Sequence, residues 1–449
     1  MVHLFTLVSN MLYRILRLLI GIGIRLYYRE IRVTNRERLT LDGPTIIIAN
    51  HPNTMLDAWI ITMLSKRPIY YMAKGTFFSS SIKRWFLKSL GLVPVNRYED
   101  SHTKGISNQK AFEHFYQLLE SGDTLLIFPE GNSTLERQLR ELRSGSARIA
   151  LEAEARNNGK LGLKIIPIGL VYVQGEKFRG SVLAKVGEII DPMEYYSKYR
   201  ESPSATGKEL TEVFRQRLDE LLVHSASKDQ EGFVDDIIEV LDGELEIDGK
   251  KGVEGKVDSI KMIHSRLNKI YSDHPQVFAD IEKLVYKIKW QLNTMDIDSK
   301  FLSAKLKKNG VILEGIGIIL TFIFGLPIFI FGLIHNVFPF KLTSLLMSKI
   351  VKEPEYYAPI AILLGIVLYP LTYAIFLIAG STFFGLTWWM LLLYFMLLPF
   401  TGMFAFYYLK FLGQVSFKWR FLFLLKGKKS LLDRLRSDKR ELKSLILDK

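Results

Sequence analysis

The chain has 449 residues, enough for about three domains, and 48% of them are hydrophobic. That much apolar surface must be buried or placed in lipid, which excludes a disordered chain. The absence of cysteine excludes disulfide scaffolds, cysteine-ligated zinc, iron–sulfur clusters and cysteine nucleophiles. Of the formal net charge of +14, residues 1–40 carry +5 and residues 410–449 carry +8. Basic ends of this kind favour an anionic membrane surface over nucleic acid as a partner.

The first 29 residues are apolar but interrupted by Arg14 and Arg17. They contain no small-residue cleavage site and no uninterrupted apolar core, so a cleaved signal peptide is not expected. The pattern predicts an interfacial N-terminal helix over residues 1–29. The alternative is an ordinary helix that covers the soluble part of the chain.

Residues 30–204 alternate short apolar segments with helical ones. The predicted strands are 45–50, 68–72, 92–95, 124–128, 164–173 and 181–190, and the predicted helices are 53–64, 80–90, 106–120 and 144–157. Strands that are apolar throughout, most of them followed by a helix, indicate a mostly parallel sheet flanked by helices. The predicted fold class is therefore α/β.

Residues 205–310 are charged, patterned as helices and free of strand-like runs, so they are predicted to form a helical insert or linker. A membrane domain is predicted for residues 311–409. Within it, the 52 residues 358–409 contain no charged residue and no histidine, which fits two membrane spans with a turn near Gly380.

Residues 315–340 are also apolar but contain Gly325 and Pro327 in the middle. They could form one kinked span or a re-entrant hairpin. We favour the re-entrant hairpin, because it keeps every basic cluster, including the predicted tail at 410–449, on the cytoplasmic side.

Polar residues follow several predicted strands, at the edge where open α/β sheets bind their ligands. His51 and Asp57 follow the first strand. A neutral imidazole can take a proton from an alcohol, and a carboxylate on its other nitrogen fixes the tautomer and stabilises the imidazolium. The alternative is a surface or capping histidine and an aspartate in a first helical turn.

Arg97 follows the predicted strand 92–95, and its planar charged group suits a phosphate. Arg137 and Arg140 could face the same crevice and bind an anionic substrate. A surface arginine for Arg97 and a solvated helix face for the other two are the alternatives.

Glu130 lies between Pro129 and Gly131, a pair that forces a tight turn. Such a turn can aim the glutamate and expose backbone N–H groups, although a solvated acid in a strand-to-loop turn is the alternative. Pro167 interrupts an apolar strand and predicts an edge or a bend. It is more typical of a core residue than of a site, but it could line an acyl pocket.

Four blocks in this order resemble the glycerol-phosphate and lysophosphatidate acyltransferase superfamily (PlsC-like). The blocks are Asn50-His51…Asp57, Gly91…Arg97, Phe128-Pro129-Glu130-Gly131 and Ile166-Pro167-Ile168, within residues 40–192. The resemblance implies that His51 is the general base and Asp57 its partner. It also implies that Arg97 and the Glu130-Gly131 turn bind the glycerol phosphate and that Pro167 borders the acyl or acceptor pocket.

Two features depart from the family pattern. Five residues separate His51 from Asp57 instead of the usual four, as in fungal-type glycerol-3-phosphate/dihydroxyacetone-phosphate acyltransferases, and the extra residue needs a looser turn before the helix. The family often has Thr-Arg-Ser after its Phe-Pro-Glu-Gly block, whereas this chain has Asn132-Ser133-Thr134. Arg137 is a candidate to replace the missing arginine.

The resemblance implies acyl transfer from acyl-CoA or acyl carrier protein to glycerol 3-phosphate or lysophosphatidate, without a cofactor or metal. Backbone donors near Gly131 would stabilise the oxyanion. The enzyme would be an integral membrane protein with its site on the cytoplasmic face. One rival is a membrane-bound serine hydrolase using Ser146, which lacks a Gly-x-Ser-x-Gly context. The other is a non-catalytic membrane scaffold.

Overall fold

The structure is a computed structural model that describes residues 2–95, 108–223, 228–241, 252–297, 299, 308–427 and 429–448. It divides into two compact units. The first, called here the sheet unit, consists of Met1–His224, Gly252–Val257 and Val351–Leu363. The second, called the helical unit, consists of Ser225–Lys251, Asp258–Ile350 and Leu364–Lys449. After leaving the sheet unit at residue 224, the chain therefore returns to it twice.

The sheet unit contains a seven-stranded sheet in the order β1-β7-β6-β2-β5-β3-β4. Its strands are β1 (Glu30–Thr34), β2 (Thr45–Ala49), β3 (Ile69–Lys74), β4 (Leu92–Val95), β5 (Thr124–Ile127), β6 (Lys164–Val173) and β7 (Ser181–Val186). All neighbours are parallel except β6 and β7, which are antiparallel. Strands β2 and β5 are buried along their whole length, as unbroken apolar runs require. The predicted fold class is confirmed.

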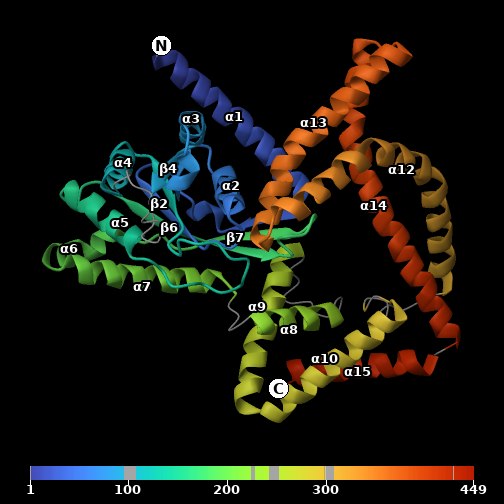
Figure 1. Cartoon of the computed structure of the whole chain (residues 1–449). Helices are drawn as coiled ribbons and strands as arrows, with labels where there is room; N and C mark the ends of the chain where they lie inside the picture. The colour runs from blue at the N-terminus through green and yellow to red at the C-terminus, as the bar shows by residue number, and fades with distance from the viewer. Residues whose placement is uncertain are drawn as a thin grey trace. The chain divides into compact units, whose positions relative to one another are not determined.

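Helices cover both faces of this sheet (Figure 1). They are α1 (Val2–Tyr27), α2 (Met55–Leu64), α3 (Ser81–Ser89), α4 (Asn108–Glu120), α5 (Gly145–Arg156), α6 (Tyr196–Glu201) and α7 (Pro203–Leu221). Helix α1 packs against α2 and α3, whereas α5 packs against α4, α6 and α7. The residues that the sequence motifs single out follow the C-terminal ends of β2 and β5, which pair in parallel.

Two elements of the sheet unit differ from the sequence-based expectations. Strand β1 was not predicted, because two of its five residues are charged and it pairs at the edge with β7 alone. Helix α7 (Pro203–Leu221) contains the predicted domain boundary after residue 204 and belongs to the sheet unit. Its charged composition conceals a buried stripe with four-residue spacing, formed by Leu210, Phe214 and Leu218.

Pro167 lies in β6 between β2 and β7, so the edge position predicted for it is wrong. The pairing of β6 with β7 shifts by one residue between Ile168↔Val186 and Ile165↔Ile190. This shift is a β-bulge, and the missing N–H of the proline falls where the ladder is already interrupted. The N–H of Gly187 donates to the Pro167 carbonyl at 2.8 Å.

The helical unit contains most of α9 (Gly252–Asp273), together with α8 (Lys228–Val240), α10 (Pro275–Met295) and α15 (Lys429–Leu447). Helix α10 packs against α8 and α15. Four apolar residues of α15 are buried, namely Leu432, Leu435, Leu442 and Ile446. Lys287 of α10 forms an ion pair with Asp438 of α15 at 2.6 Å. The basic segment predicted as a tail therefore ends in an amphipathic helix docked on the predicted insert.

Three helices of the described chain are long and apolar enough to cross a membrane: α12 (Lys308–Ile350), α13 (Tyr357–Phe384) and α14 (Trp388–Gly427). Helices α13 and α14 contain the residues of the two predicted spans, and their crossing of a membrane stays a prediction. The turn between them lies at 385–387 rather than near Gly380, because Gly385 adopts the left-handed conformation (φ 61°) that ends a helix.

Helix α12 is continuous, with Pro327 and Pro339 inside it, and Figure 1 shows it bent into an arch. Residues 315–340, for which a re-entrant hairpin is predicted, therefore lie within one bent helix, and their re-entry into the membrane stays a prediction. Each proline removes one backbone hydrogen bond and bends the helix, while the bonds on either side persist.

Asn336 of α12 joins all three apolar helices. Its Nδ2 donates to the carbonyl of Leu398 in α14 at 3.2 Å, and its Oδ1 accepts from the hydroxyl of Tyr373 in α13 at 2.6 Å. Asn336 is 8% exposed. A buried amide among apolar helices is costly unless it is hydrogen-bonded, so these contacts fix how the three helices align.

We expect Tyr373→Phe to destabilise the helical unit by about 0.6–2 kcal/mol, because it leaves Asn336 Oδ1 without this donor. Thermal unfolding of the detergent-solubilised protein measures the effect. The control is Thr382→Val, which removes a hydroxyl that donates only within α13, to the Ile378 carbonyl (2.9 Å) and the Ala379 carbonyl (3.4 Å). Equal midpoints for the two variants would contradict the role of Asn336.

Candidate active site

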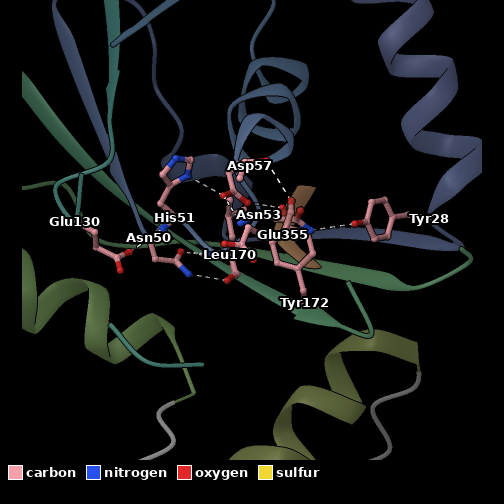
Figure 2. Close-up of polar contacts among 10 residues, drawn as sticks. Tyr28, Asn50, His51, Asn53, Asp57, Glu130, Leu170, Tyr172 and Glu355 are labelled. Carbon is pink, nitrogen blue, oxygen red and sulfur yellow. Dashed lines mark hydrogen bonds and ion pairs between the residues drawn. The ribbon is translucent and has the colours of Figure 1, made fainter. Parts of the chain in front are cut away.

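The site forms where β2 and β5 end side by side. These strands pair in parallel over four residues, so their C-terminal ends lie at the same edge of the sheet. His51 follows β2 and Glu130 follows β5. The backbone N–H of His51 donates to Glu130 Oε1 at 2.8 Å, across 79 positions of sequence (Figure 2).

His51 and Asp57 form the predicted pair. Nδ1 of His51 lies 2.9 Å from Oδ2 of Asp57, a fully buried residue in the first turn of α2. The same carboxylate accepts the N–H of Asn53 at 2.7 Å and the Tyr172 hydroxyl at 2.6 Å (Figure 2). Three donors thus compensate a charge that has lost its water. An acceptor on Nδ1 keeps that nitrogen protonated and leaves Nε2 as the basic nitrogen.

The imidazole is held by its surroundings but keeps contact with solvent. Its ring stacks on Phe128 with centroids 3.9 Å apart and planes 9° apart. The His51 carbonyl accepts the N–H of Thr134 at 3.2 Å. The side chain of His51 is 16% exposed, against 0% for Asp57. The pair therefore has a buried orienting end and an accessible basic end, the order that general base catalysis needs.

Asn50 extends the sheet beyond the last residue of β2. Its side chain accepts the N–H of Leu170 at 2.7 Å and donates to the Leu170 carbonyl at 2.9 Å. These two hydrogen bonds to the backbone of one residue in β6 take the place of a further backbone pair between β2 and β6. This contact holds the chain in place just before His51.

Glu130 is 8% exposed, and both of its oxygens accept backbone N–H groups. Oε1 binds the N–H of His51 and Oε2 binds the N–H of Arg140 at 3.2 Å. Burial raises the pKa of Glu130, partly offset by these two hydrogen bonds and by His51. The carboxylate thus joins the end of β2 to the loop after β5. Its binding of substrate stays a prediction.

Gly131 has φ 74° and its N–H donates to the Phe128 carbonyl at 3.1 Å. That amide closes the turn, so an oxyanion donor would have to be another group. A Cβ at Gly131 would lie 3.1 Å from Nε of Arg143, which packs over the turn. Both the backbone and the close arginine therefore require glycine here.

Two of the three arginines predicted to bind an anion, Arg137 and Arg140, follow β5. Arg140 has an exposed side chain and Arg137 is half-buried, both in the irregular loop between β5 and α5. The Arg140 carbonyl accepts from Arg215 Nη2 at 2.9 Å, which ties this loop to α7. Arg97 lies outside the described residues. Pro167 pairs with Ile48 inside the sheet, and its place beside an acyl pocket stays a prediction.

Sequence reasoning missed two tyrosines that support the pair. Tyr172 donates to Asp57, and burial, followed by the charge of Asp57, raises its pKa well above the usual value. Tyr28 accepts from Asn53 Nδ2 at 3.4 Å and donates to the Gly175 carbonyl at 2.6 Å. The available signal was the position of Tyr172 near the end of an apolar strand, where a buried hydroxyl needs a partner.

Comparisons with known proteins show what the residues around this site are similar to. Residues 30–171 match the family model described as Acyltransferase. A 1-acyl-sn-glycerol-3-phosphate acyltransferase of Chlamydomonas reinhardtii is 27% identical over 32% of this chain and 39% of its own length. A chloroplastic 1-acyl-sn-glycerol-3-phosphate acyltransferase of Arabidopsis thaliana is 25% identical over 35% of this chain and 40% of its own. The chain thus spans about two fifths of the length of these relatives.

Two further matches are to a yeast enzyme and to a crystal structure. Glycerol-3-phosphate O-acyltransferase 2 of Saccharomyces cerevisiae is 30% identical over 24% of this chain and 15% of its own length. The crystal structure of the 1-acyl-sn-glycerophosphate acyltransferase PlsC from Thermotoga maritima aligns with a TM-score of 0.33 and 20% identity. That alignment covers 45% of this chain and 78% of the other.

Residues 30–171 are thus similar to the Acyltransferase family, as the resemblance to glycerol-phosphate and lysophosphatidate acyltransferases implies. The matched range contains His51, Asp57 and Glu130 and ends one residue before Tyr172. The pair and the turn that the structure brings together thus lie within the family region.

We expect Glu130→Gln to reduce both stability and activity, because an amide offers one acceptor where two backbone N–H groups need one each. The unmatched N–H costs about 1–3 kcal/mol. Burial raises the pKa of Glu130 in the folded protein above the value of about 4.3 that it has in the unfolded chain. The folded wild type therefore binds more protons than the unfolded chain between these two pKa values, and its free energy of unfolding falls as pH rises through them. The Gln variant lacks this slope.

Chemical denaturation at several pH values measures the difference between the two proteins. The exposed Glu141→Gln, in the same loop, is the matched control and should behave as the wild type. A Glu130→Gln protein with unchanged stability and activity would show that the two hydrogen bonds do not organise the site.

Proposed function

We propose that the chain is a membrane-bound O-acyltransferase. It would move a fatty acyl group from acyl-CoA or acyl carrier protein to glycerol 3-phosphate or lysophosphatidate. The observation that carries this proposal is the His51–Asp57 pair, with its accessible basic nitrogen, inside a segment of the Acyltransferase family. The names of the relatives support these acceptor classes.

In the proposed reaction, Nε2 of His51 takes the proton of the acceptor hydroxyl as its oxygen attacks the thioester carbonyl carbon. Asp57, with its three donors, stabilises the imidazolium. The tetrahedral intermediate then expels the thiolate by breaking the C–S bond, and the proton on His51 passes to the sulfur. The scheme balances without a covalent acyl-enzyme or an added cofactor.

The anionic headgroup of the acceptor would be bound by arginines. Arg140 and Arg137 are the described candidates, and Arg97 is the third that the family resemblance implies. Guanidinium groups suit phosphate because their fork matches two of its oxygens. Glu130, whose oxygens already accept two backbone N–H groups, would position His51 and this loop.

The rival functions have weaker support. Ser146, the candidate nucleophile of a serine hydrolase, is 3% exposed and lies inside α5. A scaffold could use α8, α9, α10 and α15 to hold partners, but it gives no reason for a buried carboxylate that orients an accessible imidazole. Labelling by a fluorophosphonate probe would favour the hydrolase.

We expect His51→Ala to lower the rate of acyl transfer by about 10²–10⁴-fold, because the acceptor hydroxyl loses its base. The assay uses membranes, a labelled acyl donor and competing glycerol 3-phosphate and lysophosphatidate. His274→Ala, an exposed histidine in the helical unit, is the control and should keep full activity. Wild-type turnover by His51→Ala at equal membrane level would overturn the assignment.

The contacts within each unit support the re-entrant arrangement of α12. Helix α9 begins in the sheet unit, where Val253 N–H donates to Glu30 at 2.9 Å and Glu254 pairs with Arg32 at 2.8 Å. Helices α9 and α10 are charged and cannot cross a bilayer. We infer that the chain enters α12 from the side of the membrane on which α9 begins.

The segment after α12, Val351–Leu363, again belongs to the sheet unit. A helix whose two ends lie on one side has to dip into the membrane and return, which fits its arch. Helix α13 would then cross, α14 would cross back, and α15 would meet α10 on the original side. The basic residues before α12 and after α14 make that side the cytoplasmic one.

Single-cysteine labelling tests this arrangement cleanly, because the chain has no cysteine of its own. We expect Lys352→Cys and Ser437→Cys to react with a membrane-impermeant maleimide from the cytoplasmic side of sealed vesicles. Thr387→Cys, in the turn between α13 and α14, should react only from the other side. Labelling of Lys352→Cys and Ser437→Cys from opposite sides would refute the dip.

Helix α1 supports attachment at the membrane surface. Six of its large apolar side chains are exposed. Five of them follow one another at spacings of three and four residues, namely Met11, Ile15, Leu18, Ile22 and Leu26, and the sixth is Leu19. Such a row on one helical face, with Arg14, Arg17 and Arg25 nearby, is typical of an interfacial helix. We propose that this face lies in the headgroup region.

A further inference from the structure

Thr54, between His51 and Asp57, has a strained backbone. Its φ of 44° and ψ of −128° form a conformation that residues other than glycine rarely adopt. It is the second residue of a turn in which the N–H of Leu56 donates to the Asn53 carbonyl at 3.0 Å. Strain of this kind costs about 1–3 kcal/mol and persists only where the surroundings enforce it.

The surrounding contact comes from a distant part of the chain. Oγ1 of Thr54 donates to the carbonyl of Glu355, 301 positions away, at 3.2 Å. Glu355 lies in the short helix Pro354–Tyr356, within the segment 351–363, which comprises the link between α12 and α13 and the start of α13. Val351, Ala358 and Ile362 of this segment are buried, and the segment belongs to the sheet unit.

The turn that Thr54 occupies also carries Asn53. The Asn53 N–H donates to Asp57 Oδ2, the oxygen that faces His51 Nδ1. A shift of Thr54 would therefore move a donor of Asp57 and disturb the orientation of the imidazole. The extra residue between His51 and Asp57 makes this turn longer, and the Glu355 carbonyl fixes it.

We propose that the segment 351–363 is a positioning element of the active site. The Glu355 carbonyl holds Thr54 in its strained turn and thereby sets the geometry of the His51–Asp57 pair. The link between two apolar helices, together with the start of the second, thus keeps the general base aligned. The effect on activity rests on the proposed acyltransferase function, whereas the anchoring itself does not.

The test compares three substitutions of Thr54. Thr54→Val has nearly the same shape but no hydroxyl, and we expect kcat to fall about 10–100-fold with KM little changed. Thr54→Ser keeps the hydroxyl and should restore most of the rate. Thr54→Gly relieves the strain without the anchor, so it should fold at least as stably as the valine variant and still be slow. Thr62→Val, near the C-terminal end of α2, is the control and should keep the wild-type kcat and KM.

A second measurement does not depend on activity. Hydrogen exchange of residues 351–363 should quicken in Thr54→Val and stay unchanged in Thr54→Ser and Thr62→Val. Wild-type kcat and protection in Thr54→Val would overturn the proposal. If the wild type transferred no acyl group with any donor, the proposed function would fall, and the exchange result alone would decide whether Glu355 anchors the turn.

Discussion

The site depends on burying one charge. A carboxylate without water is tolerated only if donors surround it, and the three donors to Asp57 come from different parts of the fold. His51 follows β2, Asn53 belongs to the turn before α2, and Tyr172 lies near the end of β6. The parallel order of β6, β2 and β5 places these segments at one edge of the sheet, with Glu130 beside them. The geometry of the basic nitrogen is thus a property of the whole sheet.

Much of this could be predicted from sequence because it depends on local patterns. The unbroken apolar runs that became β2, β5 and β6 predicted the sheet, and the residues after them predicted the His51–Asp57 pair and its neighbour Glu130. The failures concern distant contacts. Strand β1 needs a partner 151 positions away to be recognised. Pro167 is tolerated inside the sheet because of a bulge that follows β7, between Val186 and Ile190.

The same distinction explains the rest of the site. The tight turn at Gly131 was predicted from its composition, but the direction of Glu130 was not, because it depends on amides from two loops. Tyr172 and the carbonyl of Glu355 reach the pair through tertiary packing, which no spacing in the sequence encodes. In the helical unit, α15 was predicted to be a basic tail, because the packing of its buried leucines against α10 is a tertiary contact.

The parallel pairing of β1 with β7 has a consequence for synthesis of the chain. At about 5–20 residues per second, β1 leaves the ribosome roughly 8–30 seconds before the strand it must join. The sheet is complete only when β7 has been synthesised, long after the apolar helix α1 has emerged. A nascent chain paused in this interval would carry an unpaired strand directly behind a lipid-seeking helix, so early contact of α1 with the bilayer would shield the translation intermediate from aggregation.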